Sequence, residues 1–185
     1  MKKLRLSLLF VIILMSTLGL SGCSGMREKF LKTDDSKIAN KCFEELIKNI
    51  QNQDADAIRL QFSNNVLKET QNMDENICLL FDYFKGEMLS YNDWGATGTE
   101  IGVNDDGKHR NWKKLRSTYD IETTEDKYRV AMVFISKDTA DEYNVGIQSL
   151  YIIRFEDDTD PQYAYRGDGM DTPGINIGEK NIIPD

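Results

Sequence analysis

Cysteine is scarce in this sequence. Its 185 residues include three cysteines, Cys23, Cys42 and Cys78. The two that follow Cys23 are too few for a disulfide-stabilised scaffold or a zinc site. Both lie on or beside apolar helical stripes, where a free cysteine packs as a small hydrophobic side chain. We therefore predict no disulfide and no metal site, with a Cys42–Cys78 bond outside the cell as the alternative.

Histidine is scarcer still. His109 is the only one, and it follows the turn-like stretch Asp106-Gly107-Lys108. A histidine base has to lie within reach of a nucleophile, so we expect His109 to be exposed and predict no catalytic residue. The acidic clusters near residues 105 and 156 do not match the spacing of calcium-binding loops. They are interpreted as solvated turns, and the sequence indicates no cofactor.

Positive charge is also in short supply. The chain carries 23 basic and 31 acidic residues, and three of the basic ones, Lys2, Lys3 and Arg5, precede residue 23. Without residues 1–22 the net charge is therefore 20 − 31 = −11. Such a domain is repelled by phosphate backbones, which argues against nucleic acid as a partner. Anionic lipid head groups would repel it as well.

The N-terminus has the pattern of an export signal. Lys2, Lys3 and Arg5 precede a mostly apolar run over residues 6–20, which is shorter than the roughly 20 residues that span a bilayer. The run ends in Leu20-Ser21-Gly22-Cys23, which resembles the bacterial lipobox. We predict that residues 1–22 are cleaved and that Cys23 carries lipid, which anchors the protein at the extracytoplasmic face of the cell membrane. The alternative is an uncleaved anchor helix.

The remaining chain divides into a tether, a domain and a tail. Residues 23–35 are polar and charged and are interpreted as the lipidated N-terminus and its tether. Apolar residues then recur at helical spacing over residues 36–51, after Asp54 and after Asp74, which predicts three helices. Residues 89–103, 112–123, 128–136 and 145–155 are typical of strands. The domain is therefore expected at 36–157, followed by a polar tail at 158–185 whose apolar end, 175–183, could dock on it.

The predicted hairpin assigns side chains to the two faces of the sheet. If Thr123 lies opposite Tyr128, then Ser117, Tyr119 and Met132 point towards the helices, and Glu122 pairs with Arg129 across the strands. Strand alternation in residues 145–155 places Tyr151 on the same side. These tyrosines form either an ordinary core or a ligand pocket. The residues that we take as the candidate pocket are Ser117, Tyr119, Tyr128, Met132 and Tyr151.

Two stretches carry a resemblance to known families. The segment Asn-Gln-Asp-Ala-Asp-Ala-Ile at residues 52–58, with Phe62-Ser63 after it, is similar to a stretch of the nuclear transport factor 2-like superfamily. Residues 127–130 and 145–150 resemble an uncharacterised family of small lipoproteins from low-GC Gram-positive bacteria. The resemblance implies a cystatin-like α+β domain, with three helices packed on a curved four-stranded antiparallel sheet. It implies no activity.

We therefore expect a membrane-anchored, non-catalytic accessory module. It would hold a small apolar ligand in the cone of the sheet or bind another envelope protein. One alternative is a hydrolase or isomerase that uses polar groups in the cone. Another is an interaction or inhibitor protein that acts through the outer face of the sheet, for which an exposed apolar patch would be the sign.

The lipid anchor is directly testable. Replacing Cys23 with alanine removes the thiol that accepts the lipid, so we expect Cys23→Ala to abolish incorporation of labelled palmitate and to leave an unprocessed precursor. Metabolic labelling followed by gel analysis measures both. Label retained on the variant would show a second anchor and contradict the predicted localisation.

Overall fold

The computed structural model describes residues 24–94, 98–102, 112–159 and 172–178. Residues 1–34 and 35–185 form separate compact units, and every contact described below lies within the second. The described helices are α2 (Ser24–Gln51), α3 (Ala55–Gln61), α4 (Asn64–Glu69), α5 (Met73–Tyr83) and the short 3-10 turns η1 (Glu142–Asn144) and η2 (Asp157–Thr159). The strands are β1 (Met88–Asp93), β2 (Gly98–Gly102), β3 (Trp112–Thr123), β4 (Lys127–Asp138), β5 (Gly146–Arg154) and β6 (Gly174–Ile177).

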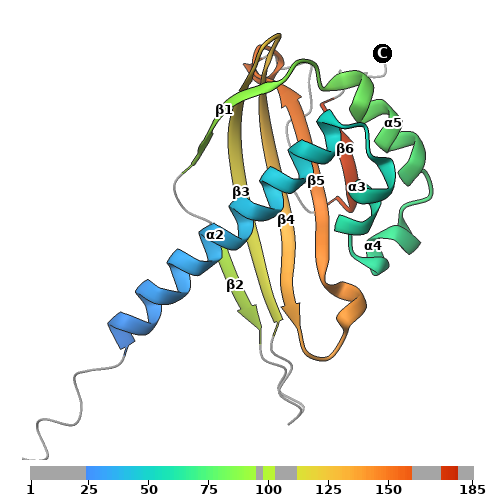
Figure 1. The fold of residues 1–185 in the computed structure, drawn as a ribbon. Coiled ribbons are helices and arrows are strands. Elements are labelled where there is room, and N and C mark those ends of the chain that lie inside the picture. Colours follow the sequence, from blue (N-terminus) through green and yellow to red (C-terminus); the bar gives the residue numbers. More distant parts are fainter. Residues whose placement is uncertain (1–23, 95–97, 103–111, 160–171, 179–185) are drawn as a thin grey trace, which may run out of the picture. The chain divides into compact units, whose positions relative to one another are not determined.

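The fold is α+β, as expected, but its sheet is larger than predicted. Within the described residues, six strands pair: five in the order β1-β3-β4-β5-β6, and β2 with β3 (Figure 1). The expected first strand at 89–103 is in fact two strands, which share one edge of β3: β1 pairs with its second half and β2 with its first. β6 adds to β5 in parallel, so the sheet is mixed and part of the predicted tail belongs to the domain. The burial of Ile175, which is 6% exposed, explains why this strand docks.

The predicted helices are present with two corrections. α2 begins at Ser24, so residues 24–35 are helical and not an irregular tether. The helix expected after Asp54 is broken into α3 and α4, because the Ser63 hydroxyl caps α4 by accepting from the Val66 N–H at 3.2 Å. The Ser63 N–H in turn donates to the Ile147 carbonyl oxygen at 3.0 Å. This tertiary bond fixes the break.

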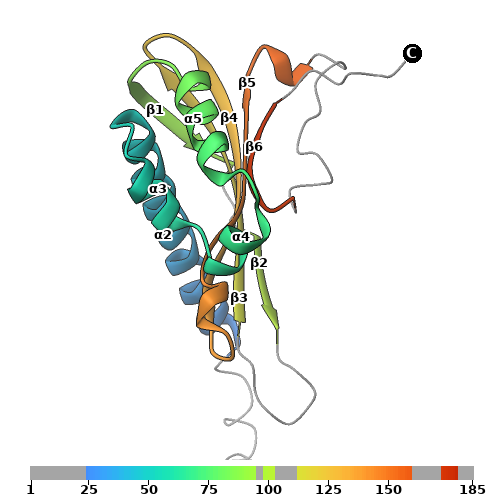
Figure 2. The same ribbon diagram turned by 90° about the vertical axis from the view of Figure 1, so that its right-hand side faces the viewer.

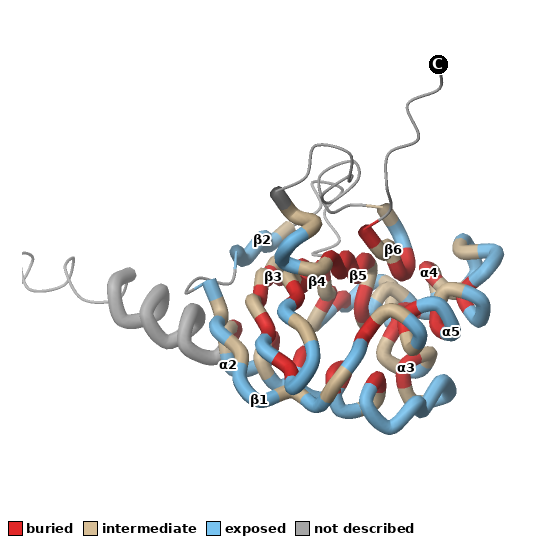
Figure 3. The backbone as a smooth tube through the Cα atoms, turned by 90° about the horizontal axis from the view of Figure 1, so that it is seen from above, coloured by how far each residue is buried: buried red, intermediate tan, exposed pale blue. Residues whose placement is uncertain are grey.

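The main core lies between the helices and one face of the sheet. α2, α3 and α5 lie on the same side of the strands (Figure 2), and buried residues gather along β3, β4 and β5 (Figure 3). Phe43 of α2 stacks on Tyr119 of β3 with ring centroids 3.8 Å apart and planes 11° apart. Both side chains are fully buried. A second, smaller cluster lies on the opposite face and consists of Ala131, Val133, Tyr151 and Ile153.

The hairpin register differs from the predicted one by two residues. Ile121, and not Thr123, lies opposite Tyr128, because Thr123 and Asp126 close a tight turn: the Thr123 N–H donates to the Asp126 carbonyl oxygen at 2.9 Å. A shift of two leaves every side chain on its predicted face. The partners change, however. Glu122 pairs with Lys127 at 3.2 Å, and the predicted Glu122–Arg129 pair is wrong.

A bulge in β5 reverses the predicted side of Tyr151. Phe134 lies opposite Ile147, whereas the preceding Val133 lies opposite Ser149, so Gln148 is an extra residue on β5. Strand alternation is therefore broken at Gln148. Ile147 belongs to the main core, while Tyr151 lies in the cluster on the opposite face.

The aromatic contact beneath α2 generates a stability prediction. Phe43→Ala removes a fully buried ring that stacks on Tyr119, and it should lower the free energy of unfolding by about 3–5 kcal/mol. Leu60 of α3 is 84% exposed, so Leu60→Ala should change that energy by no more than about 0.5 kcal/mol. Urea denaturation of both variants measures the difference. Equal effects would contradict the described packing.

Cys42 and Cys78, the two cysteines within the described residues, are free in the structure. Cys78 is exposed, however, and not buried as predicted. Burial, with a smaller contribution from Glu45, raises the pKa of the Cys42 thiol to about 12, so almost none of it is thiolate near pH 8.

Among the described residues, no helix is long and apolar enough to cross a membrane.

The difference between Cys42 and Cys78 predicts two reactivities. With Cys23 replaced by alanine, the folded protein at pH 8 should consume one equivalent of a disulfide thiol reagent rapidly at Cys78. Cys42 should react only after denaturation. The absorbance of the group that each thiol releases from the reagent, measured with and without denaturant, gives the number of reacted cysteines in each state. No reaction after denaturation without reductant would show a disulfide.

Candidate binding site at the hairpin end of the sheet

Four of the five residues predicted to line a pocket lie together on the helix-facing side. Tyr119, Tyr128 and Met132 belong to the main core and are at most 1% exposed. Ser117, at 7% exposed, lies directly opposite Met132. The Tyr119 hydroxyl donates to Asn40 Oδ1 at 3.0 Å. These surroundings are those of packed core residues.

Tyr151 is separated from the other four because it lies on the opposite face. The pocket was predicted from side-chain alternation, and that alternation fails at the bulge. A ligand site among the remaining four would require the packed rings of α2 and β3 to move apart. It stays a prediction.

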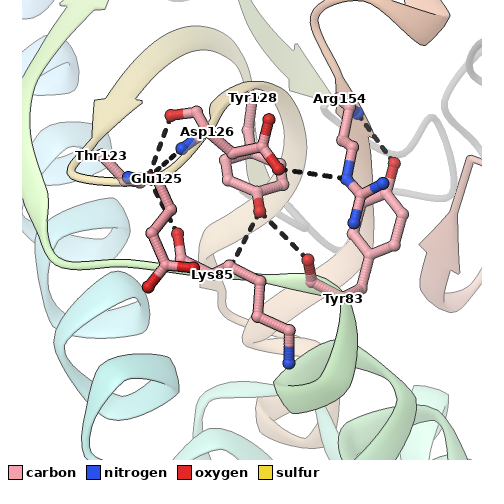
Figure 4. Close-up of polar contacts among 7 residues, drawn as sticks. All are labelled: Tyr83, Lys85, Thr123, Glu125, Asp126, Tyr128 and Arg154. Atoms are coloured by element: carbon pink, nitrogen blue, oxygen red, sulfur yellow. Dashed lines mark hydrogen bonds and ion pairs between the residues drawn. The ribbon is translucent and has the colours of Figure 1, made fainter.

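A polar network holds the end of the sheet that carries the β3–β4 hairpin (Figure 4). The Tyr128 hydroxyl accepts from the Lys85 N–H at 2.8 Å and donates to the Tyr83 carbonyl oxygen at 3.1 Å. The Tyr83 hydroxyl accepts from the Arg154 N–H at 2.8 Å. Arg154 also pairs with Asp126 at 3.3 Å. The end of α5, the hairpin and the end of β5 are thereby tied together.

The chemistry of the network suits a structural role. Burial is the main reason that the pKa of Tyr83 is raised to about 12, and burial also raises the pKa of Tyr128. Both phenols therefore stay protonated and keep their hydrogen bonds at physiological pH. At Gly86, φ is +80°, and an added Cβ would lie 2.7 Å from Thr124 Oγ1. Only glycine lets the chain pass this close to the hairpin.

Two adjoining hollows lie beside this network. One, of about 470 Å³, is lined by the turn residues and the chain just after β5. The other, of about 340 Å³, extends along β1 and β3. They share Glu122, Lys127 and Phe155. We call them together the hairpin-end groove; its lining residues are Ser90, Tyr91, Asn92, Asp120, Ile121, Glu122, Thr123, Thr124, Glu125, Asp126, Lys127, Phe155 and Glu156.

Arg129 holds two aromatic rings at the edge of the groove. Its guanidinium lies 4.5 Å from the Trp94 ring centroid and 4.8 Å from that of Phe155. The side chain is 13% exposed and forms ion pairs with Asp120, at 2.8 Å, and with Asp158. Trp94 and Phe155 remain 50% and 41% exposed. The result is a firmly held aromatic surface beside the groove.

The groove is acidic. Five carboxylates line it, against one lysine. Counting also Arg129 and Arg154, which pair with Asp120 and Asp126, the formal charge is −5 + 3 = −2. An exposed aromatic surface and a net negative charge together suit a ligand that carries both cationic and apolar groups.

Sequence reasoning missed this site because the hairpin register was two residues off. The expected partner of Arg129 was Glu122, which left Asp120 without a role. The useful signal was the outward position of Arg129, together with aromatic residues directly after two other strands, Trp94 after β1 and Phe155 after β5.

Several sequence features cannot be placed in the structure. Cys23, His109 and the acidic pair at residues 105–106 lie outside the described residues. Among the residues that are described, no group of three or more histidine, cysteine or acidic side chains is arranged to hold a metal ion.

Comparison with known proteins gives a family without an assigned activity. No curated protein matches the chain. The expectation of an uncharacterised family is confirmed, while the lipid anchor and the Gram-positive origin stay predictions. The model for the family described as Domain of unknown function (DUF5104) matches residues 45–155, from within α2 to the end of β5. The match covers more than half of the chain, so the protein belongs to that family.

Proposed function

We propose that this protein is a non-catalytic binding module, anchored by lipid on Cys23 at the extracytoplasmic face of the membrane. In this proposal the hairpin-end groove binds a basic, partly apolar segment of another envelope protein. The observation that carries the proposal is the groove itself, a hollow with excess negative charge that the exposed ring of Phe155 lines. Arg129 holds the exposed ring of Trp94 next to Phe155.

The groove has the size and rigidity of a binding site. Its two hollows, of about 470 and 340 Å³, fall within the usual range of roughly 300–1,000 Å³ for ligand sites. Thr123 and Asp126 of its lining are held by the Lys85 carbonyl oxygen and by Arg154, and Asp120 is held by Arg129. Because these side chains are already held in place, they would lose little conformational entropy on binding, which favours affinity.

The chemistry favours a peptide segment as the ligand. Aromatic rings and arginine are frequent anchors of protein interfaces. Acidic side chains around them would attract lysine or arginine from a distance and orient the encounter. The acidic character of the whole domain adds to this attraction and disfavours anionic lipid as a ligand.

Two glutamate variants test the proposal. Glu122 pairs with Lys127 at 3.2 Å inside the groove, and Glu45 pairs with Lys41 at 3.8 Å on α2; the two glutamate side chains are 50% and 57% exposed. A synthetic peptide that alternates lysine and phenylalanine should bind the full chain in detergent. Glu122→Gln should weaken that binding about two- to fivefold, whereas Glu45→Gln should leave it unchanged. Isothermal titration calorimetry at two salt concentrations measures the affinities.

A second variant tests the aromatic edge. Phe155→Ala should weaken the peptide about tenfold or more, with Leu60→Ala as the control. A peptide with glutamate in place of lysine should not bind. If both glutamate variants bind alike, or if the acidic peptide binds as well as the basic one, the groove is not a site for basic segments.

A further inference from the structure

A separate hollow lies beside the bulge at Gln148, at the end of β4 and β5 opposite to the hairpin-end groove. It has a volume of about 450 Å³ and is bordered by α4, by the connection between β4 and β5 and by the chain before β6. None of its lining residues lines the hairpin-end groove. We call it the bulge-end cleft; its polar lining residues are Asn65, Glu69, Lys114, Asn144, Gln148 and Ser149.

Three side-chain amides in this cleft are held in fixed orientations. Asn65 Nδ2 donates to Asp141 Oδ2 at 2.8 Å, and Asn144 Nδ2 donates to Asp138 Oδ2 at 3.0 Å. Gln148 Nε2 donates to two main-chain carbonyl oxygens, at 2.8 and 3.0 Å. A carboxylate or a carbonyl oxygen only accepts hydrogen bonds, so each amide must turn its nitrogen towards these partners.

The fixed nitrogens leave the amide oxygens for a ligand. In the described part of the chain, the side-chain oxygens of Asn65, Asn144 and Gln148 accept no hydrogen bond. The nitrogens of Asn65 and Asn144 are held by Asp141 and Asp138, which do not line the cleft. The Gln148 nitrogen is held by the main-chain oxygens of Asn144 and Gly146. The amides therefore offer three acceptors of fixed position, which an incoming donor can meet without any rotamer being reordered.

The rest of the lining indicates a neutral ligand. Among the lining residues, Glu69 and Lys114 contribute one negative and one positive charge. Asp138 and Asp141, which hold two of the amides, lie outside the lining. Ser149 adds a hydroxyl, which accepts from Asn176 Nδ2 at 3.4 Å and can itself donate. Val133 and Ile135 supply an apolar surface. Donors, acceptors and an apolar surface thus lie together in one cleft.

We propose that the bulge-end cleft binds a neutral, hydroxyl-rich molecule of the size of a mono- or disaccharide. A hydroxyl both donates and accepts, so a ring bearing several of them matches the amide oxygens together with the Ser149 hydroxyl. The C–H face of such a ring suits the apolar surface. The cleft's volume suits a guest of this size.

Nuclear magnetic resonance on the full chain in detergent tests the proposal. Maltose, cellobiose and diacetylchitobiose are titrated separately while the side-chain NH₂ signals of Asn65, Asn144 and Gln148 are followed. At least one disaccharide should shift these signals in a saturable way. The wild-type measurement needs no substitution, so it stands even if a variant folds poorly.

Two asparagine variants provide the matched comparison. Asn65→Leu removes an acceptor from the cleft and should weaken the disaccharide about fivefold, the effect of one lost hydrogen bond. Asn49 is also partly buried and donates through Nδ2 to a single side chain, Gln61, at 3.2 Å, but it does not line the cleft. Asn49→Leu should leave the affinity unchanged. Melting curves identify a variant that has lost its fold, and Gln148→Leu then replaces it.

Other outcomes overturn the proposal. If none of the three disaccharides shifts the amide signals, or if both asparagine variants weaken binding equally, the cleft is not a saccharide site. If calcium chloride or the lysine–phenylalanine peptide shifts them and the disaccharides do not, the cleft binds cations or peptides instead. The comparison of Glu122→Gln with Glu45→Gln, which tests the hairpin-end groove, does not depend on these results. The two proposals therefore fail independently.

Discussion

Phe43 and Tyr119 stack face to face between α2 and β3, with ring centroids 3.8 Å apart. The Tyr119 hydroxyl is also bonded to Asn40, one turn earlier on the same helix. Nearer the N-terminus of α2, the buried Asp35 forms an ion pair with Lys113 of β3. Aromatic contact, hydrogen bond and ion pair together fix the rotation and the position of the helix. With α2 in this position the helix-facing side of the sheet is filled. The hairpin-end groove and the bulge-end cleft, which are proposed to bind ligands, therefore lie elsewhere.

The order of helices and strands was largely predictable because it follows from local patterns. Apolar residues at helical spacing located α2 and α5, and alternation located β3, β4 and β5. The hairpin register was wrong by two residues, since the Thr123–Asp126 turn depends on bonds made by the Thr123 side chain. An even error preserved the faces. The bulge at Gln148 was not visible in the sequence, and one extra residue was enough to misplace Tyr151.

Long-range pairing was beyond what patterns could show. β6 joins the sheet through residues far from β5 in sequence, and nothing local distinguishes Gly174–Ile177 from a docked tail. The hairpin-end groove was missed for a similar reason, since Trp94, Arg129 and Phe155 meet only when β1, β3, β4 and β5 are in register. The anchored amides of the bulge-end cleft are a tertiary feature too. The exposure of Cys78 was missed as well, because it depends on which side of α5 packs against the core.

The parallel addition of β6 has a consequence for how the protein is made. Asn176 bonds through its side chain to the Ser149 hydroxyl and to the main-chain oxygens of Leu150, Thr172 and Gly174, so β6 is held by contacts that cannot form until residues near the end of the chain are present. During synthesis, β5 is therefore left as a long apolar edge strand, the kind of surface that pairs with other chains. The domain reaches its final form only when residues 174–177 have paired with β5. A nascent chain that stalls before residue 174 is the form most exposed to aggregation and to quality-control proteases.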